Sequence, residues 1–447
     1  MPMGASGSGV EETTQGSGVF WLGAVYTFLM VSRTVEFIDG SGQLHLTFIL
    51  GLACIIALIS TGLLPKMLIS TQGKWMNLFC FWVFVGLPFS TWKGGSVHAF
   101  PGWFKSYLTF LIVGGLIFTL KQYRTITVIL ALSTISQIYL AYRNKVNAEE
   151  DRLAVTYGSL GNANDLASAL LIGLPFILFA MSDKKVNPLL RILCPPLLIA
   201  LLVAVLKTGS RGGLVAMAIL LMVAFVKSHA AGKMKIIVGG IAIAAMFAMV
   251  VPSDMRTRYL TIFKNDRTAL TVSALDSSTA RKELLTNAFL LTLRHPVFGV
   301  GLAQFSPQSF NLFVSRGVVG MWFTCHDIFG LVSSETGIPG LIFFCGIIVS
   351  SFRLLSRLAK VEKSTPELEL ISRMSNTLLM SLVAYVACGI FNTQAYTHQL
   401  PVLAALTAAL DRISAPYLAA AGPVQRAPMP APYVNRRLAQ RTAQAVS

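Results

Sequence analysis

The sequence predicts an all-α polytopic membrane protein with about twelve transmembrane helices and one large outward-facing loop. Of its 447 residues, 54% are hydrophobic and only 12% are charged, which is about half the roughly 25% charged share of soluble domains. The apolar residues form repeated long runs, and a bilayer core about 30 Å thick needs roughly 20 apolar residues per helix. The mean hydropathy of +0.66 agrees with this pattern. A soluble enzyme built around one buried core is therefore excluded.

The apolar runs define twelve candidate spans. They cover residues 19–36, 44–64, 75–92, 105–120, 125–142, 165–182, 189–206, 212–227, 236–251, 328–352, 371–391 and 400–415. From them we expect a flexible cytoplasmic N-terminus (1–18), transmembrane helices one to nine (19–251), a periplasmic loop with amphipathic helices (252–327), transmembrane helices ten to twelve (328–415) and a flexible basic cytoplasmic tail (416–447). The Gly/Ser-rich start has no basic n-region, so a cleaved signal peptide is not expected.

The net charge of +17 is distributed among short loops between the spans. A basic face on a soluble domain, which nucleic-acid binding would require, is not visible. Alternate loops hold most of the cations, and the positive-inside rule then places both termini in the cytoplasm. The basic residues of these inward loops are Lys66, Lys74, Lys121, Arg124, Lys184, Lys185, Arg191, Lys227, Lys233, Lys235, Arg353, Arg357, Lys360 and Lys363.

Residues that bind metals, nucleotides or disulfide partners do not occur in useful patterns. The six cysteines include no CxxC pair and no zinc-like spacing. A Walker-type phosphate loop and an HExxH motif are also missing from the sequence. We therefore expect no metal site and no cofactor.

Residues 252–327 form the longest segment between two spans, and they are rich in Arg, Lys and aromatic residues. Structureless loops longer than about 12–15 residues are uncommon unless they are functional or disordered. The apolar periodicity within this segment predicts amphipathic helices. If the chain has a functional site, this loop is the first place where we expect it.

The first candidate is Lys207-Thr-Gly-Ser-Arg-Gly-Gly213, between two spans on the outward side. Arg211 stands where a helix begins, and a helix N-terminus with its free N–H groups favours anions. The planar guanidinium can hold two phosphate oxygens at once. Lys207 adds a second cation. The alternative is an arginine that extends to the membrane interface with no ligand.

The second candidate is Arg281. It lies within Ser277-Ser-Thr-Ala-Arg-Lys-Glu-Leu-Leu-Thr-Asn-Ala-Phe-Leu-Leu-Thr292, a segment with helical periodicity. Ser278 or Thr279 is expected to cap the helix. Helical spacing places Arg281 on the buried face, with the stripe Leu284, Leu285, Ala288, Leu291 and Thr292. A buried arginine needs an anionic partner, which is either a ligand or a structural acid such as Asp276 or Glu335.

The third candidate is His326, which precedes the apolar span at 328–352. An imidazole can accept a proton near neutral pH and so suits a general base. Asp327 or Glu335 is a candidate for orienting it. The alternative is a hydrogen-bonded interfacial histidine, which is also how we interpret His45, His98, His229, His295 and His398.

Weaker candidates precede the sixth span. Arg143, Lys145 and Arg152 are outward cations that can attract an anionic head group. Asn164 and Asp165 are expected first of all to cap the helix that follows them. We also expect Asn164 to contribute to substrate binding.

Taken in order, these segments resemble the O-antigen ligase and polymerase family of bacterial inner-membrane glycosyltransferases. The matching motifs are Gly161-Asn-Ala-Asn-Asp-Leu-Ala167, Ser210-Arg-Gly-Gly213, Ala280-Arg281, Pro296-Val-Phe-Gly-Val-Gly301, His326-Asp327 and Glu335-Thr-Gly-Ile-Pro-Gly-Leu341. The chain departs from the family at Asp327, because the family usually has Asn after that histidine.

The resemblance implies a metal-independent transfer of a glycan from undecaprenyl pyrophosphate to an acceptor hydroxyl on the periplasmic side of the inner membrane. By the same resemblance, Arg211 and Arg281 hold the pyrophosphate and His326 activates the acceptor. The acceptor is lipid A-core for a ligase, a second lipid-linked repeat unit for a polymerase, or a protein side chain for a glycosylating relative. We favour the ligase; the oligomeric state is left open.

A secondary transporter is the alternative from another class, since twelve spans suit it as well. Transporters usually show repeated halves and ionisable residues near the bilayer midplane. Here the halves look unlike, and most ionisable residues lie at span ends. Arg33 and Glu36 are exceptions and are expected to form a local pair. A scaffold without catalysis would leave Arg281 and His326 unexplained.

Overall fold

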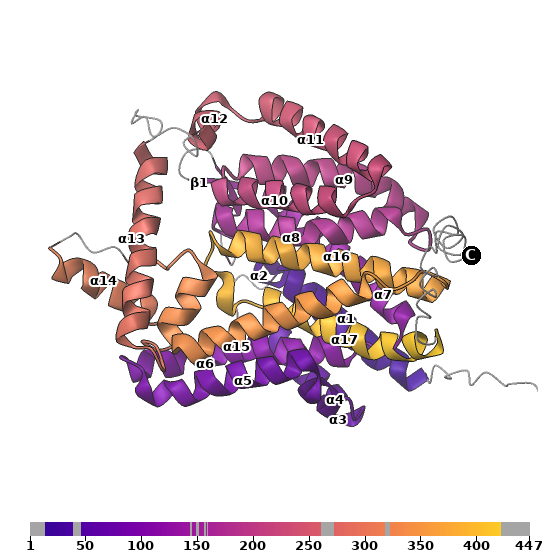
Figure 1. Cartoon of the computed structure of the whole chain (residues 1–447), viewed down its shortest axis with the longest axis horizontal. Coiled ribbons are helices and arrows are strands. Elements are labelled where there is room, and N and C mark those ends of the chain that lie inside the picture. Colours follow the sequence, from indigo (N-terminus) through magenta and orange to yellow (C-terminus); the bar gives the residue numbers. More distant parts are fainter. Residues whose placement is uncertain are drawn as a thin grey trace, which may run out of the picture.

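The computed structural model describes residues 14–38, 46–143, 145–148, 152–155, 158, 160–260, 272–317 and 322–421. Its described part is helical except for one two-stranded hairpin, which confirms the all-α class (Figure 1). Among the described residues, seven helices are long and apolar enough to cross a membrane, and Gly18–Ser32 and Leu46–Ser60 are shorter apolar helices. Helices occupy the predicted spans, but a count of twelve crossings stays a prediction, as does the division into five regions.

The elements follow one another along the chain as α1 (Thr14–Ser32), α2 (Val35–Ile38), α3 (Leu46–Ser60), α4 (Leu64–Ile69), α5 (Thr71–Gly86), η1 (Leu87–Phe89), α6 (Lys93–Gly115), α7 (Leu120–Arg143), β1 (Lys145–Ala148), β2 (Arg152–Val155), α8 (Ala163–Ser182), α9 (Pro188–Lys207), α10 (Arg211–Lys227), α11 (Ala230–Val250), α12 (Ser253–Leu260), α13 (Val272–Arg294), α14 (Phe305–Ser315), α15 (Ile328–Leu358), α16 (Pro366–Gly389), η3 (Gln394–Tyr396) and α17 (Gln399–Ala420).

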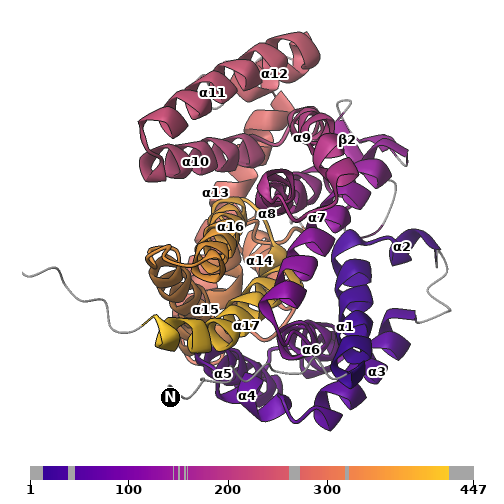
Figure 2. The ribbon, with the colours of Figure 1, turned by 90° about the vertical axis from the view of Figure 1, so that its right-hand side faces the viewer.

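The long helices run side by side as a bundle, and α13 crosses one end of it (Figure 1). We call this the site end, because α12, α13, α14 and the hairpin all lie there. The hairpin pairs β1 and β2 antiparallel and packs through β2 on α7, α8 and α9. Viewed along the bundle, α10 and α11 stand to one side (Figure 2). Residues 252–327 thus contain helices, as the sequence predicts.

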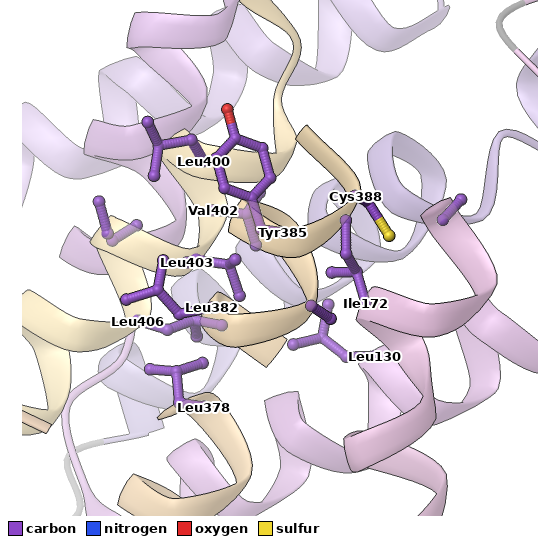
Figure 3. Packing of buried hydrophobic residues seen from close by; sticks show 14 of the residues in the cluster. Leu130, Ile172, Leu378, Leu382, Tyr385, Cys388, Leu400, Val402, Leu403 and Leu406 are labelled. Atoms are coloured by element: carbon purple, nitrogen blue, oxygen red, sulfur yellow. The ribbon is translucent and has the colours of Figure 1, made fainter. Parts of the chain in front are cut away.

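The centre of the bundle is formed by α7, α8, α16 and α17 (Figure 3). Leu130, Ile172, Leu382 and Tyr385 interlock there, and all are buried. Lipid tails are as apolar as leucine, so helices in a membrane gain stability mainly from close van der Waals packing. Helix α17 suits this need because its buried face includes the small residues Ala404, Ala405, Ala408 and Ala409.

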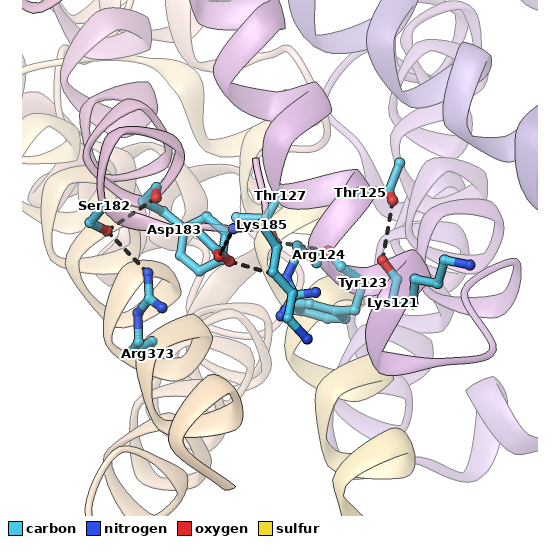
Figure 4. Close-up of polar contacts among 10 residues, drawn as sticks. Lys121, Tyr123, Arg124, Thr125, Thr127, Ser182, Asp183, Lys185 and Arg373 are labelled. Carbon is cyan, nitrogen blue, oxygen red and sulfur yellow. Dashed lines mark hydrogen bonds and ion pairs between the residues drawn. The ribbon is translucent and has the colours of Figure 1, made fainter. Parts of the chain in front are cut away.

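The opposite end, which we call the basic end, is held by polar contacts between helix termini (Figure 4). The Arg124 Nε donates to Asp183 Oδ2 over 3.0 Å, which joins the start of α7 to the end of α8. Arg373 in α16 donates to Ser182 Oγ over 3.2 Å. These contacts bring together loops that the charge pattern assigns to one side of the membrane.

Helix α15 is broken near the site end, at Glu335-Thr-Gly-Ile-Pro339. Gly337 has φ 72°, which interrupts the helix, and Pro339 has no N–H to offer the Glu335 carbonyl four residues earlier. The turn after α13 supplies the missing partners. Val300 N donates to Ser334 O over 2.8 Å, Gly301 N donates to Glu335 O over 3.0 Å, and Ile338 N donates to Pro296 O over 2.8 Å.

This turn is Pro296-Val-Phe-Gly-Val-Gly301, one of the motifs of the family resemblance, and it follows the end of α13 at Arg294. A Cβ atom on Gly299 or Gly337 would collide with the backbone of the other segment, so both positions require glycine for close approach. Phe298 stacks on Trp82 and Phe89, with ring centroids 4.9 and 4.3 Å away. Two of the motifs that carry the family resemblance therefore interlock.

We predict that α14 and the α15–α16 loop lie on opposite sides of the membrane. Single cysteines at Ser315 and Ser364, both exposed, would be introduced into a variant whose native cysteines are replaced. A membrane-impermeant thiol reagent, added to cells with a permeabilised outer membrane, should label Ser315→Cys and spare Ser364→Cys. Labelling of Ser364→Cys alone would reverse the predicted orientation.

Candidate active site

Arg211 is the first residue of α10 and is half-buried at the site end. Ser210 caps this helix, because its hydroxyl accepts a hydrogen bond from Gly213 N over 3.1 Å. The chain reaches this cap through Gly209, which has φ 62°. The predicted helix start with an arginine at its mouth is therefore present. Lys207 ends α9 on the other side of the same short turn and is also half-buried.

Arg152 joins this turn to the hairpin and to α8. Its Nε donates to Thr208 O over 2.8 Å and its Nη2 donates to Asn164 Oδ1 over 3.2 Å. Arg152, Asn164 and the Lys207–Arg211 turn thus form one group, which we call the cation cluster. Arg143 ends α7 with an exposed side chain, and it makes no hydrogen bond or ion pair with the described residues of the cluster.

The expected cap of α8 was wrong by two residues. The helix begins at Ala163, and Asn162 Oδ1 accepts from Asn164 N over 2.8 Å. Asn162 is therefore the cap, which leaves the Asn164 amide oxygen available to Arg152. Asp165 lies further into the helix, where it interacts with Asn392 and Gln394.

Tyr259 was not predicted from the sequence. It lies on α12, is buried, and donates its hydroxyl hydrogen bond to Leu206 O over 2.9 Å. This contact fixes the beginning of the outward segment to the end of α9, beside Lys207. A single tyrosine in a basic segment offers no pattern from which this role could have been read.

His326 occupies a constrained position immediately before α15. Its φ of 54° lies in the left-handed region, which costs a non-glycine residue about 1–3 kcal/mol. Asp327 then caps α15 by accepting from Gly330 N. Glu335 accepts from Phe305 N over 3.0 Å. Both candidate orienting acids thus accept hydrogen bonds from backbone N–H groups, and an orienting role of either toward the imidazole stays a prediction.

The environment of His326 favours a neutral imidazole. Burial, and after it the positive charge of Arg281, lower the pKa of His326 to about 4. Both causes disfavour the protonated ring. Arg281 on α13 and His326 before α15 are therefore electrostatic neighbours, as an active site that contains both requires. At neutral pH the ring is free to accept a proton.

Helix α13 presents a different face to the protein than the sequence predicts. Leu284, Ala288 and Leu291 are buried as expected, but Leu285 is 50% exposed. Asn287 takes its place and is fully buried. The exposed Leu285 was assigned to the stripe because a leucine one position from the true face still fits a loose helical spacing.

The Asn287 amide is satisfied at both ends. Its Nδ2 donates to Ser309 Oγ over 2.9 Å, and its Oδ1 accepts from Arg316 Nη2 over 2.6 Å. A buried amide without partners would cost about 1–3 kcal/mol, so these contacts fix α14 against α13. The expected caps Ser278 and Thr279 were wrong, because α13 begins already at Val272. Arg281 itself is half-buried on the border of this face.

The end of α16 lies between the cation cluster and the Arg281–His326 pair. A Cβ atom on Gly389 would collide with Ile328, the first residue of α15. A Cβ atom on Gly212 would collide with Phe391, two residues further along. The α16 terminus is therefore packed between the start of α15, next to His326, and the start of α10, next to Arg211. Arg211 and the Arg281–His326 pair flank the same short piece of chain.

A polar cavity of about 240 Å³ lies on the other side of the α8 start, lined among others by Arg33, Asp165 and His398. Arg33 pairs with Glu36 over 3.0 Å, which confirms the predicted local pair. Its Nη2 also contacts His398 Nδ1 over 2.9 Å. A guanidinium only donates, so His398 Nδ1 is the acceptor. His398 is therefore a hydrogen-bonded histidine, as the sequence predicts.

Metal ligands do not cluster in the part of the chain that the structure describes, where no group of three His, Cys, Asp or Glu residues could hold an ion. The anion-binding groups that are present are guanidinium and ammonium groups and a helix start. Such a set suits a phosphate or pyrophosphate.

A family model described as O-antigen ligase matches residues 196–345, about a third of the chain. The match confirms the resemblance to the O-antigen ligase and polymerase family that the sequence motifs indicate. It includes Lys207, Arg211, Arg281 and His326, whereas Arg143, Arg152 and Asn164 precede it. A search of curated proteins finds no match to the chain.

We predict that His326 titrates at about pH 4 and that Arg281→Gln raises its pKa toward the ordinary 6.5, because the variant removes a neighbouring positive charge. The measurement is NMR of protein labelled with ¹³C-histidine, with His326→Gln used to assign the signal. A pKa near 6.5 in the unaltered protein would contradict the described environment.

Proposed function

We propose that this chain, whose residues 196–345 match the O-antigen ligase family, transfers a glycan from undecaprenyl pyrophosphate to an acceptor hydroxyl at the periplasmic face of the bacterial inner membrane. The preferred acceptor is lipid A-core, as in an O-antigen ligase. The proposal includes metal-independent transfer, in which guanidinium groups neutralise the pyrophosphate.

The observation that carries the proposal is the neutral His326 beside Arg281, across the α16 terminus from Arg211. Burial of the ring and the positive charge of Arg281 hold the His326 imidazole in its proton-accepting form. This combination suits a reaction that needs a base and an anion-binding group at one place.

The cation cluster suits the diphosphate of the donor. Arg211 lies at the helix start of α10, where the helix dipole adds partial positive charge. Arg152 and Lys207 stand on either side of the turn, and Arg152 is positioned by Thr208 and Asn164. Cations at the membrane surface would bind the diphosphate while the lipid tail remains among the apolar helices.

The reaction then follows from ordinary acid–base chemistry. The acceptor oxygen attacks the anomeric carbon of the donor sugar, and the bond from this carbon to the pyrophosphate oxygen breaks. The electron pair leaves with the pyrophosphate, where Arg211 and Arg281 stabilise the developing negative charge. His326 takes the proton of the acceptor hydroxyl. The products are the glycosylated acceptor, undecaprenyl pyrophosphate and one proton, which His326 releases.

Donor binding would also improve the base. In the free protein the charge of Arg281 contributes to the low pKa of His326. A bound pyrophosphate brings negative charge that offsets Arg281, and an anion near an imidazole raises its pKa. The base would thus gain strength only when the donor is in place, which would limit transfer to the ternary complex.

We predict that Arg211→Lys and Arg281→Lys each lose most activity although the protein still reaches the membrane. Lysine keeps the charge but not the two-point fork that suits a diphosphate. In a deletion strain, the unaltered gene should restore glycan on lipid A-core, whereas the variants should leave free core and accumulate lipid-linked polymer on gels. Capped single repeat units in the deletion strain would instead identify a polymerase. Near-normal function of both lysine variants would mean that a diffuse positive field suffices.

We further predict that His326→Ala lowers turnover by about 10²–10⁴-fold, the usual contribution of a general base, while donor binding is nearly unchanged. His326→Gln should be equally slow, since an amide can hydrogen-bond but cannot take the proton. The assay is glycan transfer in proteoliposomes with purified lipid-linked donor. Full activity of His326→Gln would make the histidine structural.

A further inference from the structure

A second cavity, of about 380 Å³, lies at the basic end between α5, α15 and α17. Its lining includes Arg353 and Arg357 on α15, Gln72 and Trp75 on α5, and Asp411 on α17. It is at the far end of the bundle from the cation cluster and takes no part in the proposed reaction. We propose that it binds the head group of an anionic phospholipid with a single phosphodiester, such as phosphatidylglycerol.

The charges of the cavity leave one cation to be neutralised. Arg353 and Arg357 are four residues apart on α15 and therefore share a face of the helix. Arg357 Nη2 contacts Asp411 Oδ1 over 3.3 Å. Arg353 is exposed, and its guanidinium has no hydrogen-bond acceptor among the described residues. The lining thus carries two positive charges and one negative charge, which matches one monoanionic phosphodiester.

Gln72 indicates that the ligand also offers hydrogen bonds. Its side chain is fully buried, and both its Oε1 and its Nε2 lack a partner among the described residues. An amide buried in this way costs free energy until a donor and an acceptor are supplied. The phosphate oxygens of phosphatidylglycerol accept, and the hydroxyls of its glycerol head group donate. Both needs can therefore be met by one lipid head group.

Three of the other lining residues form an apolar wall, which favours a lipid over a free phosphate. Trp75, Val349 and Leu354 line the cavity, and Val349 is 43% exposed. The Trp75 ring lies against Gly346, where a Cβ atom would collide with it. Tryptophan is enriched where a membrane meets water, and basic pockets between membrane helices bind anionic lipid head groups. A free phosphate could use the arginines but would gain nothing from this wall.

The test measures thermal unfolding of the full chain in a neutral detergent. Phosphatidylglycerol should raise the unfolding temperature, because a ligand that binds only the folded state stabilises it. Phosphatidylethanolamine should have a smaller effect, and sodium phosphate at matched ionic strength should have none. An equal effect of phosphatidylethanolamine or of sodium phosphate, or no effect of phosphatidylglycerol, would overturn the proposal.

Three variants separate the cavity from a general attraction of anions to the basic end. Arg353→Gln should weaken phosphatidylglycerol binding roughly fivefold, the usual contribution of one cation near a lipid head group. Ser350→Leu fills the cavity and keeps both arginines, and the hydroxyl that it removes donates to Ile347 O of its own helix over 3.1 Å. It should weaken binding at least as much, and if it does not fold, Arg353→Gln decides alone.

Lys363→Gln is the matched control, because it removes an exposed cation near the end of α15 that does not line the cavity. It should bind phosphatidylglycerol like the unaltered chain. An equal loss in Lys363→Gln and Arg353→Gln would assign the effect to surface charge and contradict the proposed site. Because the readout is binding, these results do not depend on the glycosyltransferase proposal.

Discussion

The break in α15 is the constraint on which the site end depends. A glycine with positive φ and a proline two residues later deprive the helix of part of its own hydrogen-bond ladder. Backbone groups inside a membrane protein cannot be left without partners, since each would cost several kcal/mol. The turn after α13 supplies these partners. Trp82 on α5 adds another, because its Nε1 donates to Thr336 O over 2.9 Å. The helix that carries His326 at its start is thereby locked to the helix that carries Arg281.

This coupling explains why the motifs of the sequence are short and dispersed. Each motif contributes one side of a contact whose other side lies far along the chain. Gly299 meets Glu335, Gly212 meets Phe391, and Arg152 meets Thr208. None of these pairs has a local pattern. Their members become recognisable only as an ordered set, and as such a set they resemble the O-antigen ligase and polymerase family.

The sequence predicted what depends on local chemistry and missed what depends on packing. Apolar runs and loop charges indicated the membrane class, and the Gly-Ser-Arg-Gly segment indicated a helix start at Arg211. The caps of α8 and α13 were misplaced, because several consecutive Ser, Thr, Asn and Asp residues offer equal capping oxygens and tertiary contacts choose among them. The β1–β2 hairpin was not anticipated, since strands of four residues carry little periodic signal. Leu285 was assigned to the wrong face for a related reason. The buried position belongs to Asn287, whose contacts with Ser309 and Arg316 come from distant residues and cannot be predicted from helical periodicity.

The lock between the turn and α15 also has a consequence for how the molecule is assembled. Synthesis proceeds from the N-terminus, so α12, α13 and α14 leave the ribosome before α15 exists. The buried face of α13, with Leu284, Ala288 and Leu291, has α15 as its main partner and must wait for it. The Pro296–Gly301 turn likewise gains its hydrogen bonds to Ser334, Glu335 and Ile338 only after α15 has entered the bilayer. The geometry of the candidate site is therefore completed late in biogenesis, and a nascent chain that lacks α15 has no means of forming it.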